Sequence, residues 1–85
     1  MSYSVVWSNQ SIKFLNNIEP IISQRIIRIV KEFSENPRNH QFKKIKGEKS
    51  FRLRVGDYRI IFDFDKDKER IEILDIGHRK NVYKR

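Results

Sequence analysis

The chain has 85 residues, no cysteine and a formal net charge of +8, with an isoelectric point near 10.1. This length allows one domain (1–85) with one modest core. Without cysteine there is no disulfide framework and no thiolate metal site, and a reducing cytoplasm fits best. Arginines interrupt the apolar stretches and the N-terminus lacks a charged region followed by an apolar core, so we predict neither a signal peptide nor a membrane span.

The positive charge is concentrated in two segments. Residues 36–54 carry seven basic side chains against Glu48 alone, and residues 77–85 carry four basic side chains and no acidic one. Such a basic protein attracts an acidic partner, either nucleic acid or an acidic protein, and salt weakens the attraction. We expect the two segments to form one surface.

The chain begins with a predicted strand and a short helix. Residues 2–7 are rich in β-favouring side chains and predict a strand that is antiparallel or mixed within the sheet. Ser8 or Asn9 can cap the following helix through a side-chain oxygen, and the helix extends to about Asn16.

The apolar positions of two helices predict one side of the core. In the short helix we expect Ile12 and Leu15 to be buried, with Phe14 at the margin. Pro20 suits the first turn of a second helix, which should end before Pro37. Its apolar side chains follow helical spacing: Ile22, Ile26, Ile29, Val30 and Phe33. These two helices form a predicted helical hairpin that needs a sheet to cover.

Residues 37–50 predict a basic connector without regular structure. Phe42 and Ile45 are expected to tack it to the core, and His40 is interpreted as an exposed loop histidine. Three lysines are expected to face outward: Lys43, Lys44 and Lys46. Because they directly precede an arginine-rich segment, we interpret them as phosphate-contacting candidates.

Residues 51–64, FRLRVGDYRIIFDF, predict a tight β-hairpin with Gly56-Asp57 as its turn. Apolar and basic side chains alternate before the turn with the period of a half-buried strand. A two-residue turn sets the predicted register: Val55 with Tyr58, Arg54 with Arg59, Leu53 with Ile60, Arg52 with Ile61, and Phe51 with Phe62.

This register places Arg54 directly across from Arg59, with Arg52 beside them. Like charges in opposed positions destabilise a hairpin. A bound polyanion would justify the arrangement, because guanidinium groups match phosphate oxygens. The alternative is a solvated face on which Asp57 or Asp63 neutralises the arginines.

The last part of the chain predicts a polar turn and a final strand. Residues 65–70 lack the glycine and terminal glutamate of a calcium loop, so we reject a metal there. In residues 71–76, Ile71 and Ile73 have one parity and Leu74 and Ile76 the other, which indicates either burial on both faces or a bulge. The predicted fold is α+β: an N-terminal strand, a helical hairpin and a three-stranded antiparallel meander, forming one sheet backed by the two helices.

Cationic chemistry on a phosphodiester is the reaction that these residues allow best. The two histidines are far apart in sequence, no serine has nucleophile-elbow glycines, and the three glycines form no phosphate loop. Metal-free RNA cleavage needs a base for the 2′-hydroxyl, cations for the phosphorane and an acid for the leaving oxygen. Four arginines suit the cationic role: Arg52, Arg54, Arg59 and Arg79. His78 or Tyr83 would transfer protons, or Tyr83 would stack on a splayed base.

Two motifs resemble the RelE/ParE superfamily of toxins from toxin–antitoxin pairs. The run KKIKGEKSFRLRVGDYRIIF, residues 43–62, is similar to the family's Lys-rich loop and hairpin, and GHRKNVY, residues 77–83, resembles its closing strand motif. The order of strand, two helices and three strands covers the whole chain. Arginine stands at the second-strand positions where lysine is common in RelE.

The resemblance implies a small α+β fold, no cofactor, and a RelB-like antitoxin that wraps and blocks the protein. It further implies that RelE-like members enter the ribosomal A site and cut mRNA. By position, Arg52, Arg54, Arg59 and Arg79 match the family's basic site residues, and Tyr83 matches a tyrosine implicated in proton transfer. We add RNA-binding candidates that flank them: Lys43, Lys44, Lys46, Lys80 and Lys84.

The leading hypothesis is a ribosome-dependent, metal-independent endoribonuclease toxin of a type II toxin–antitoxin system, acting in the cytoplasm on mRNA with neither membrane nor small-molecule cofactor. The main alternative is a ParE-like toxin that inhibits DNA gyrase without chemistry. A third is an inactive relative that only binds its antitoxin or RNA.

Overall fold

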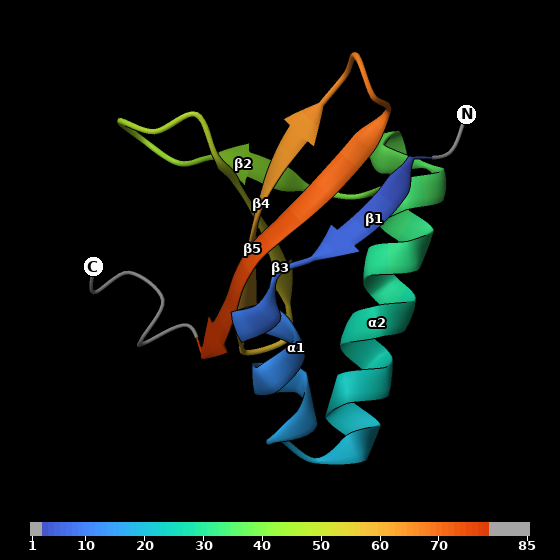
Figure 1. The fold of residues 1–85 in the computed structure, drawn as a ribbon, viewed down its shortest axis with the longest axis vertical. Coiled ribbons are helices and arrows are strands. Elements are labelled where there is room, and N and C mark those ends of the chain that lie inside the picture. The colour runs from blue at the N-terminus through green and yellow to red at the C-terminus, as the bar shows by residue number, and fades with distance from the viewer. Residues whose placement is uncertain (1–2, 79–85) are drawn as a thin grey trace.

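The computed structural model describes residues 3–78, which fold into a mixed sheet with two α-helices packed on it (Figure 1). In chain order, the elements of this part are β1 (Ser4–Trp7), α1 (Asn9–Asn16), α2 (Pro20–Glu35), the 3₁₀ helix η1 (Pro37–Asn39), β2 (Phe42–Lys44), β3 (Phe51–Val55), β4 (Tyr58–Asp65) and β5 (Arg70–His78). The predicted α+β class, helical hairpin and meander are confirmed. Within residues 3–78, no helix is both long and apolar enough to cross a membrane.

The strand order in the sheet is β1-β5-β4-β3-β2. β1 runs parallel to β5, and the other neighbouring pairs are antiparallel, so the sheet is mixed. We call the face covered by the helices the inner face and the opposite one the outer face. Side chains alternate between them along each strand.

Both helix starts follow the sequence prediction. Ser8 is the N-cap of α1, and its hydroxyl accepts a hydrogen bond from the Ser11 amide at 3.1 Å. Pro20 occupies the first turn of α2, where a missing N–H costs nothing. The prediction that Ile12 is buried is wrong, since it is 45% exposed. The inner stripe of α1 instead contains Ser11 and Leu15, which are four residues apart and both buried.

The core lies between α2 and the inner face of the sheet. Ile26, Val30 and Phe33 of α2 are buried against Leu53, Val55, Ile60, Phe62, Ile71, Ile73 and Ile76. The ring of Phe33 packs on those of Phe42 and Phe62, with centroid distances of 5.2 and 5.1 Å. Apolar burial of this kind is the main stabilising contribution in a domain of this size.

The connector contains a strand that the sequence analysis missed. Residues 42–44 form β2, which pairs antiparallel with β3 through Phe42 with Leu53, Lys43 with Arg52, and Lys44 with Phe51. A three-residue strand has too short an alternation to recognise. Its position follows from Phe42, whose ring joins the aromatic cluster of the core, 5.7 Å from Phe51.

The hairpin has the predicted register in all five pairs. Gly56 takes a φ of +58°, a left-handed conformation that glycine adopts without steric cost. In β5 the mixed parity arises from a bulge: Ile61 pairs with Asp75 and Phe62 with Ile73, so Leu74 has no partner across the strand. Its carbonyl oxygen accepts a hydrogen bond from the Ser8 hydroxyl at 2.9 Å, which ties the bulge to α1.

Candidate nucleic-acid interface

Four cationic side chains lie together on the outer face, on three neighbouring strands. They are Lys43 of β2, Arg52 and Arg54 of β3, and Arg59 of β4. Their neighbours in sequence, such as Leu53 and Ile60, point to the inner face and are buried there. The alternation that builds the core therefore also gathers the cations.

The register opposes these cations in two pairs. Lys43 lies directly across from Arg52, and Arg54 lies directly across from Arg59. Opposed like charges typically destabilise a sheet by a few tenths of a kcal/mol. Two such pairs in adjacent ladders make an electropositive surface that an anion would stabilise.

Three acidic side chains of the outer face, Asp63, Asp65 and Glu72, lie towards the other end of the sheet. A fourth, Asp75 of β5, lies across from Ile61, in the same row of the outer face as Arg52 and Lys43. Asp63, which was considered as a neutralising group, has Glu72 as its cross-strand partner. Arg70 forms ion pairs there with Glu72 at 2.9 Å and with Asp65 at 4.0 Å. Near the β3–β4 end the outer face thus carries four cations and one carboxylate, Asp75, and near the β4–β5 turn it is acidic with one paired arginine.

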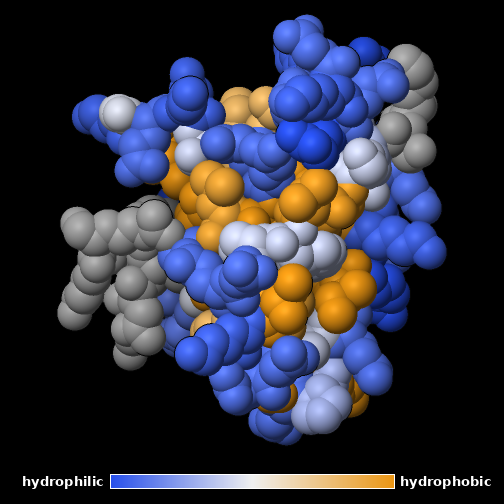
Figure 2. All heavy atoms as spheres, in the orientation of Figure 1, coloured by the Kyte–Doolittle hydropathy of each residue, from blue (hydrophilic) through white to orange (hydrophobic). Residues whose placement is uncertain are grey.

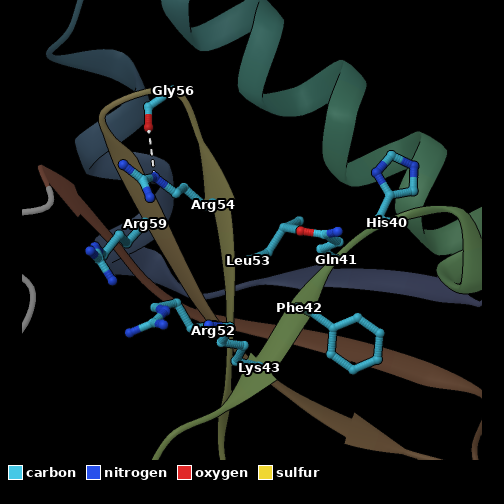
Figure 3. A pocket seen from close by; sticks show the side chains of 9 residues that line it. All are labelled: His40, Gln41, Phe42, Lys43, Arg52, Leu53, Arg54, Gly56 and Arg59. Atoms are coloured by element: carbon cyan, nitrogen blue, oxygen red, sulfur yellow. Dashed lines mark hydrogen bonds between the residues drawn. The ribbon is translucent and has the colours of Figure 1, made fainter.

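A cavity of about 500 Å³ opens beside the cationic group (Figure 3). It is lined by His40, Gln41, Phe42, Lys43, Arg52, Leu53, Arg54, Gly56 and Arg59. In Figure 3 Arg59 lies to one side of the hairpin, Arg54 lies over it below Gly56, and His40 and Gln41 lie on the other side. Nε of Arg54 donates to the carbonyl oxygen of Gly56 at 3.4 Å.

His40 is not the exposed loop residue that the sequence analysis expected. It is half-buried, its ring packs edge-to-face on Phe33 with centroids 5.8 Å apart, and it lines the cavity with Gln41. The two residues directly precede β2, so their placement depends on the strand that was missed. The expectation that Phe42 attaches the connector to the core is confirmed, and this attachment is what brings the preceding His40 to Phe33.

Other candidate residues lie away from the cavity. Lys44 pairs with Phe51 and therefore has inner-face parity. Lys46 is exposed in the β2–β3 loop, and the two lysines line a shallow depression there. His78 ends β5 across from Tyr58, with ring centroids 5.6 Å apart, and so has inner-face parity as well. The remaining candidates, Arg79, Lys80, Tyr83 and Lys84, lie outside the described residues.

The acidic turn was considered for metal binding and rejected on its sequence. Its Asp65 carboxylate accepts a hydrogen bond from the Lys68 amide at 3.2 Å, as a capped polar turn does. Among residues 3–78, no three His, Asp or Glu side chains gather in a way that would hold a metal ion.

Solved structures with this fold come from bacteria and archaea. A chain of the toxin–antitoxin complex RelBE2 from Mycobacterium tuberculosis matches with a TM-score of 0.83 and 23% identity, covering 95% of each chain. The RelB–RelE complex from Methanococcus jannaschii contains a chain with a TM-score of 0.71 and 30% identity, covering 92% of this chain and 94% of that one. The isolated Escherichia coli RelE toxin gives 0.76 and 15%, covering 91% and 84%.

Comparison at the level of sequence agrees with these structures. A search among curated proteins found no match. The model of the family described as the ParE toxin of the type II toxin–antitoxin system parDE matches residues 5–83, which is nearly the whole chain. The motifs noted in residues 43–62 and 77–83 lie within this match. The chain therefore belongs to the ParE toxin family of type II toxin–antitoxin systems, within the RelE/ParE superfamily.

Proposed function

We propose that this toxin is a ribosome-dependent, metal-independent endoribonuclease that cleaves mRNA in the A site and thereby inhibits translation. The proposal rests on one observation: two pairs of cations face each other across neighbouring strands, Lys43 with Arg52 and Arg54 with Arg59. Four cations around one cavity suit a phosphodiester, which gains negative charge in its transition state.

The arginines of the outer face would hold the scissile phosphate. Arg54 is exposed, and Arg52 and Arg59 are half-exposed, so all three can reach a ligand that lies on the sheet. A guanidinium group remains charged at physiological pH and offers a planar fork of donors, but it is a poor proton acceptor. These residues therefore stabilise the phosphorane and leave proton transfer to other groups.

Proton transfer is assigned to the C-terminal segment. His78 has inner-face parity and packs on Tyr58, so a role for it requires the substrate to pass the end of β5. Tyr83 remains the other proton-transfer candidate, with Arg79 as a further phosphate ligand. We assign RNA backbone contacts to lysines on both sides of the site: Lys43, Lys44, Lys46, Lys80 and Lys84.

We further propose that a RelB-like antitoxin is the cognate inhibitor. RelE proteins from Pyrococcus horikoshii and M. jannaschii were solved in complexes with RelB, and the M. tuberculosis RelBE2 and E. coli RelBE structures are toxin–antitoxin complexes. An antitoxin with an acidic segment would complement the outer face electrostatically and block access to RNA. The same reading places the protein in the cytoplasm, where ribosomes and mRNA are found, with no cofactor.

A ParE-like activity against DNA gyrase is the second candidate, because the matching family model describes ParE toxins. On this reading the basic surface would bind a protein or DNA without chemistry. Because both activities would use the basic surface, they are separated by assay: RNA cleavage on ribosomes tests the first, and inhibition of gyrase supercoiling tests the second.

Primer extension on a defined mRNA tests the nuclease directly. Purified protein is incubated with the mRNA, with and without programmed ribosomes. We expect cuts within A-site codons only when ribosomes are present, and loss of the cuts in the double variant Arg54→Gln, Arg59→Gln. Arg28→Gln, an exposed arginine on α2, should cut like the wild type. If folded wild-type protein makes no cuts on active ribosomes, the nuclease is refuted, and a gyrase supercoiling assay tests the alternative.

A further inference from the structure

The cavity beside the cations has two chemically different ends. One end carries four cations, Lys43, Arg52, Arg54 and Arg59, and the other is uncharged, formed by His40, Gln41, Phe42 and Leu53. Figure 3 shows the side chains of Arg52 and Arg59 on one side, Arg54 folded back towards Gly56, and Gln41 between Leu53 and His40 on the other side. A site for phosphate alone would need only the first end.

The uncharged end exists because β2 is shorter than its neighbour. The ladder between β2 and β3 ends at the pair Phe42 with Leu53, while β3 continues to Val55. Gln41 and His40 turn away at this point, and the cavity occupies the place that a longer β2 would have filled. The result is a notch in the sheet edge directly beside Arg54.

The core holds His40 in place. Its amide donates to the carbonyl oxygen of Pro37 at 3.2 Å, which closes η1. Its ring meets that of Phe33 at an interplanar angle of 90°, and Phe33 is only 1% exposed. The imidazole is therefore fixed on one side by a rigid aromatic cluster, while its half-buried state leaves part of the ring accessible to a ligand.

We propose that the uncharged end of the cavity is a nucleobase site, in which His40 stacks on the base and Gln41 hydrogen-bonds its edge. Imidazole rings stack on unpaired bases, and a glutamine amide offers a donor and an acceptor side by side, as base edges do. The ligand class is a ribonucleotide whose phosphate lies on the arginines and whose base enters the notch. The assignment rests on the proposed RNA substrate, and it makes the toxin itself selective for the base that it holds.

Nucleotide binding can be measured without ribosomes. The isotope-labelled protein is titrated with the four nucleoside 5′-monophosphates and with ribose 5-phosphate, and amide shifts are followed by NMR. We expect the nucleotides to shift the amide resonances of His40 and Gln41. They should bind roughly tenfold more tightly than ribose 5-phosphate, because a stacked base adds to the affinity. Gln41→Leu should change the order of affinity among the four bases. Gln24→Leu, an exposed glutamine on α2, should change nothing.

Two histidine variants separate base stacking from a structural role. His40→Ala should remove most of the advantage of nucleotides over ribose 5-phosphate, while ribose 5-phosphate binds as before. His40→Phe keeps a ring against Phe33 and should retain the advantage. Equal binding of nucleotides and ribose 5-phosphate by the wild type would overturn the base site, as would equal losses for both ligands in His40→Ala.

The nucleotide titration and the primer-extension assay can fail independently of each other. Ribosome-dependent cuts without any base-dependent binding would leave the nuclease standing and reject the base site. Base-dependent binding that requires His40, in a protein that makes no cuts, would support the base site and reject the nuclease.

Discussion

The guanidinium of Arg25 in α2 lies over Gly56 in the β3–β4 turn: a β-carbon on this glycine would stand 3.7 Å from Nη1 of Arg25. On the outer face, Nε of Arg54 donates a hydrogen bond to the carbonyl oxygen of Gly56. Two arginines from different layers of the fold thus meet at the tip of the hairpin, and Arg25 extends the basic surface around the sheet edge towards α2.

Replacing Gly56 tests whether backbone strain or contact with Arg25 constrains this turn. A distance of 3.7 Å is an ordinary contact, so Gly56→Ala should lose stability through its φ of +58° alone, by about 1 kcal/mol. Gly56→Asn should lose less, since asparagine tolerates this conformation. Urea denaturation gives both values. Equal losses in the two variants would show that contact, and not φ, sets the cost.

The opposed arginines should oppose folding slightly. Arg54→Thr keeps a β-favouring residue and removes the repulsion with Arg59, so the free energy of unfolding should rise by a few tenths of a kcal/mol. Arg70→Thr, at the acidic end of the same face, removes the ion pair with Glu72 and should lower it. Both differences should shrink in high salt. A loss of stability in Arg54→Thr would mean that the outer-face cations are not mutually repulsive.

The hairpin and the cations were predictable because both depend on local patterns. Alternation around a two-residue turn determines register and face together, so the pairing of Arg54 with Arg59 followed from residues 51–64 alone. The position of β2, and with it that of His40, depends instead on a contact between residues distant in sequence. Phe42 packs on Phe33, and this contact fixes where the connector meets the core. Ile12 was misplaced because α1 has only two turns, and a short apolar pattern does not define its inner side. The bulge at Leu74 was left as one of two alternatives, since parity alone does not separate them.

Binding of single-stranded RNA should depend on salt in proportion to the cations engaged. Each phosphate contact contributes about 0.7 to the slope of log K against log salt. Lys43→Gln and Arg59→Gln should each reduce the slope by roughly this amount, and Arg28→Gln should leave it unchanged. Fluorescence anisotropy with a labelled oligonucleotide at several salt concentrations provides the slopes. An unchanged slope in both outer-face variants would exclude these residues from phosphate contact.

Phe33 links the core to the candidate site. It is 1% exposed and contacts the rings of Phe42, Phe62 and His40. Phe33→Ala should therefore cost about 3–5 kcal/mol, enough to unfold a marginal domain. Phe33→Leu should cost less and leave a folded protein in which His40 has lost its aromatic support. NMR of the folded leucine variant should show larger shift changes at His40 than at Ser8, which lies across the molecule; equal changes would mean that Phe33 does not position His40.

Ser8 joins the start of α1 to the bulge in β5 and should be more important than its size suggests. Its hydroxyl accepts from the Ser11 amide at 3.1 Å and donates to the carbonyl oxygen of Leu74 at 2.9 Å. Ser8→Ala removes the helix cap and one of the donors to the Leu74 carbonyl oxygen. The free energy of unfolding should therefore fall by about 1–2 kcal/mol. Ser4→Ala provides the control, because the Ser4 hydroxyl is exposed and makes only a 3.5 Å contact with Glu69. Denaturation midpoints should therefore fall for Ser8→Ala and stay within error for Ser4→Ala.

The variant Ser8→Asp separates the two roles of Ser8. Aspartate should recover the helix cap but not the hydrogen bond to Leu74, because a carboxylate cannot donate. A full rescue by aspartate would show that the bulge needs no donor from α1.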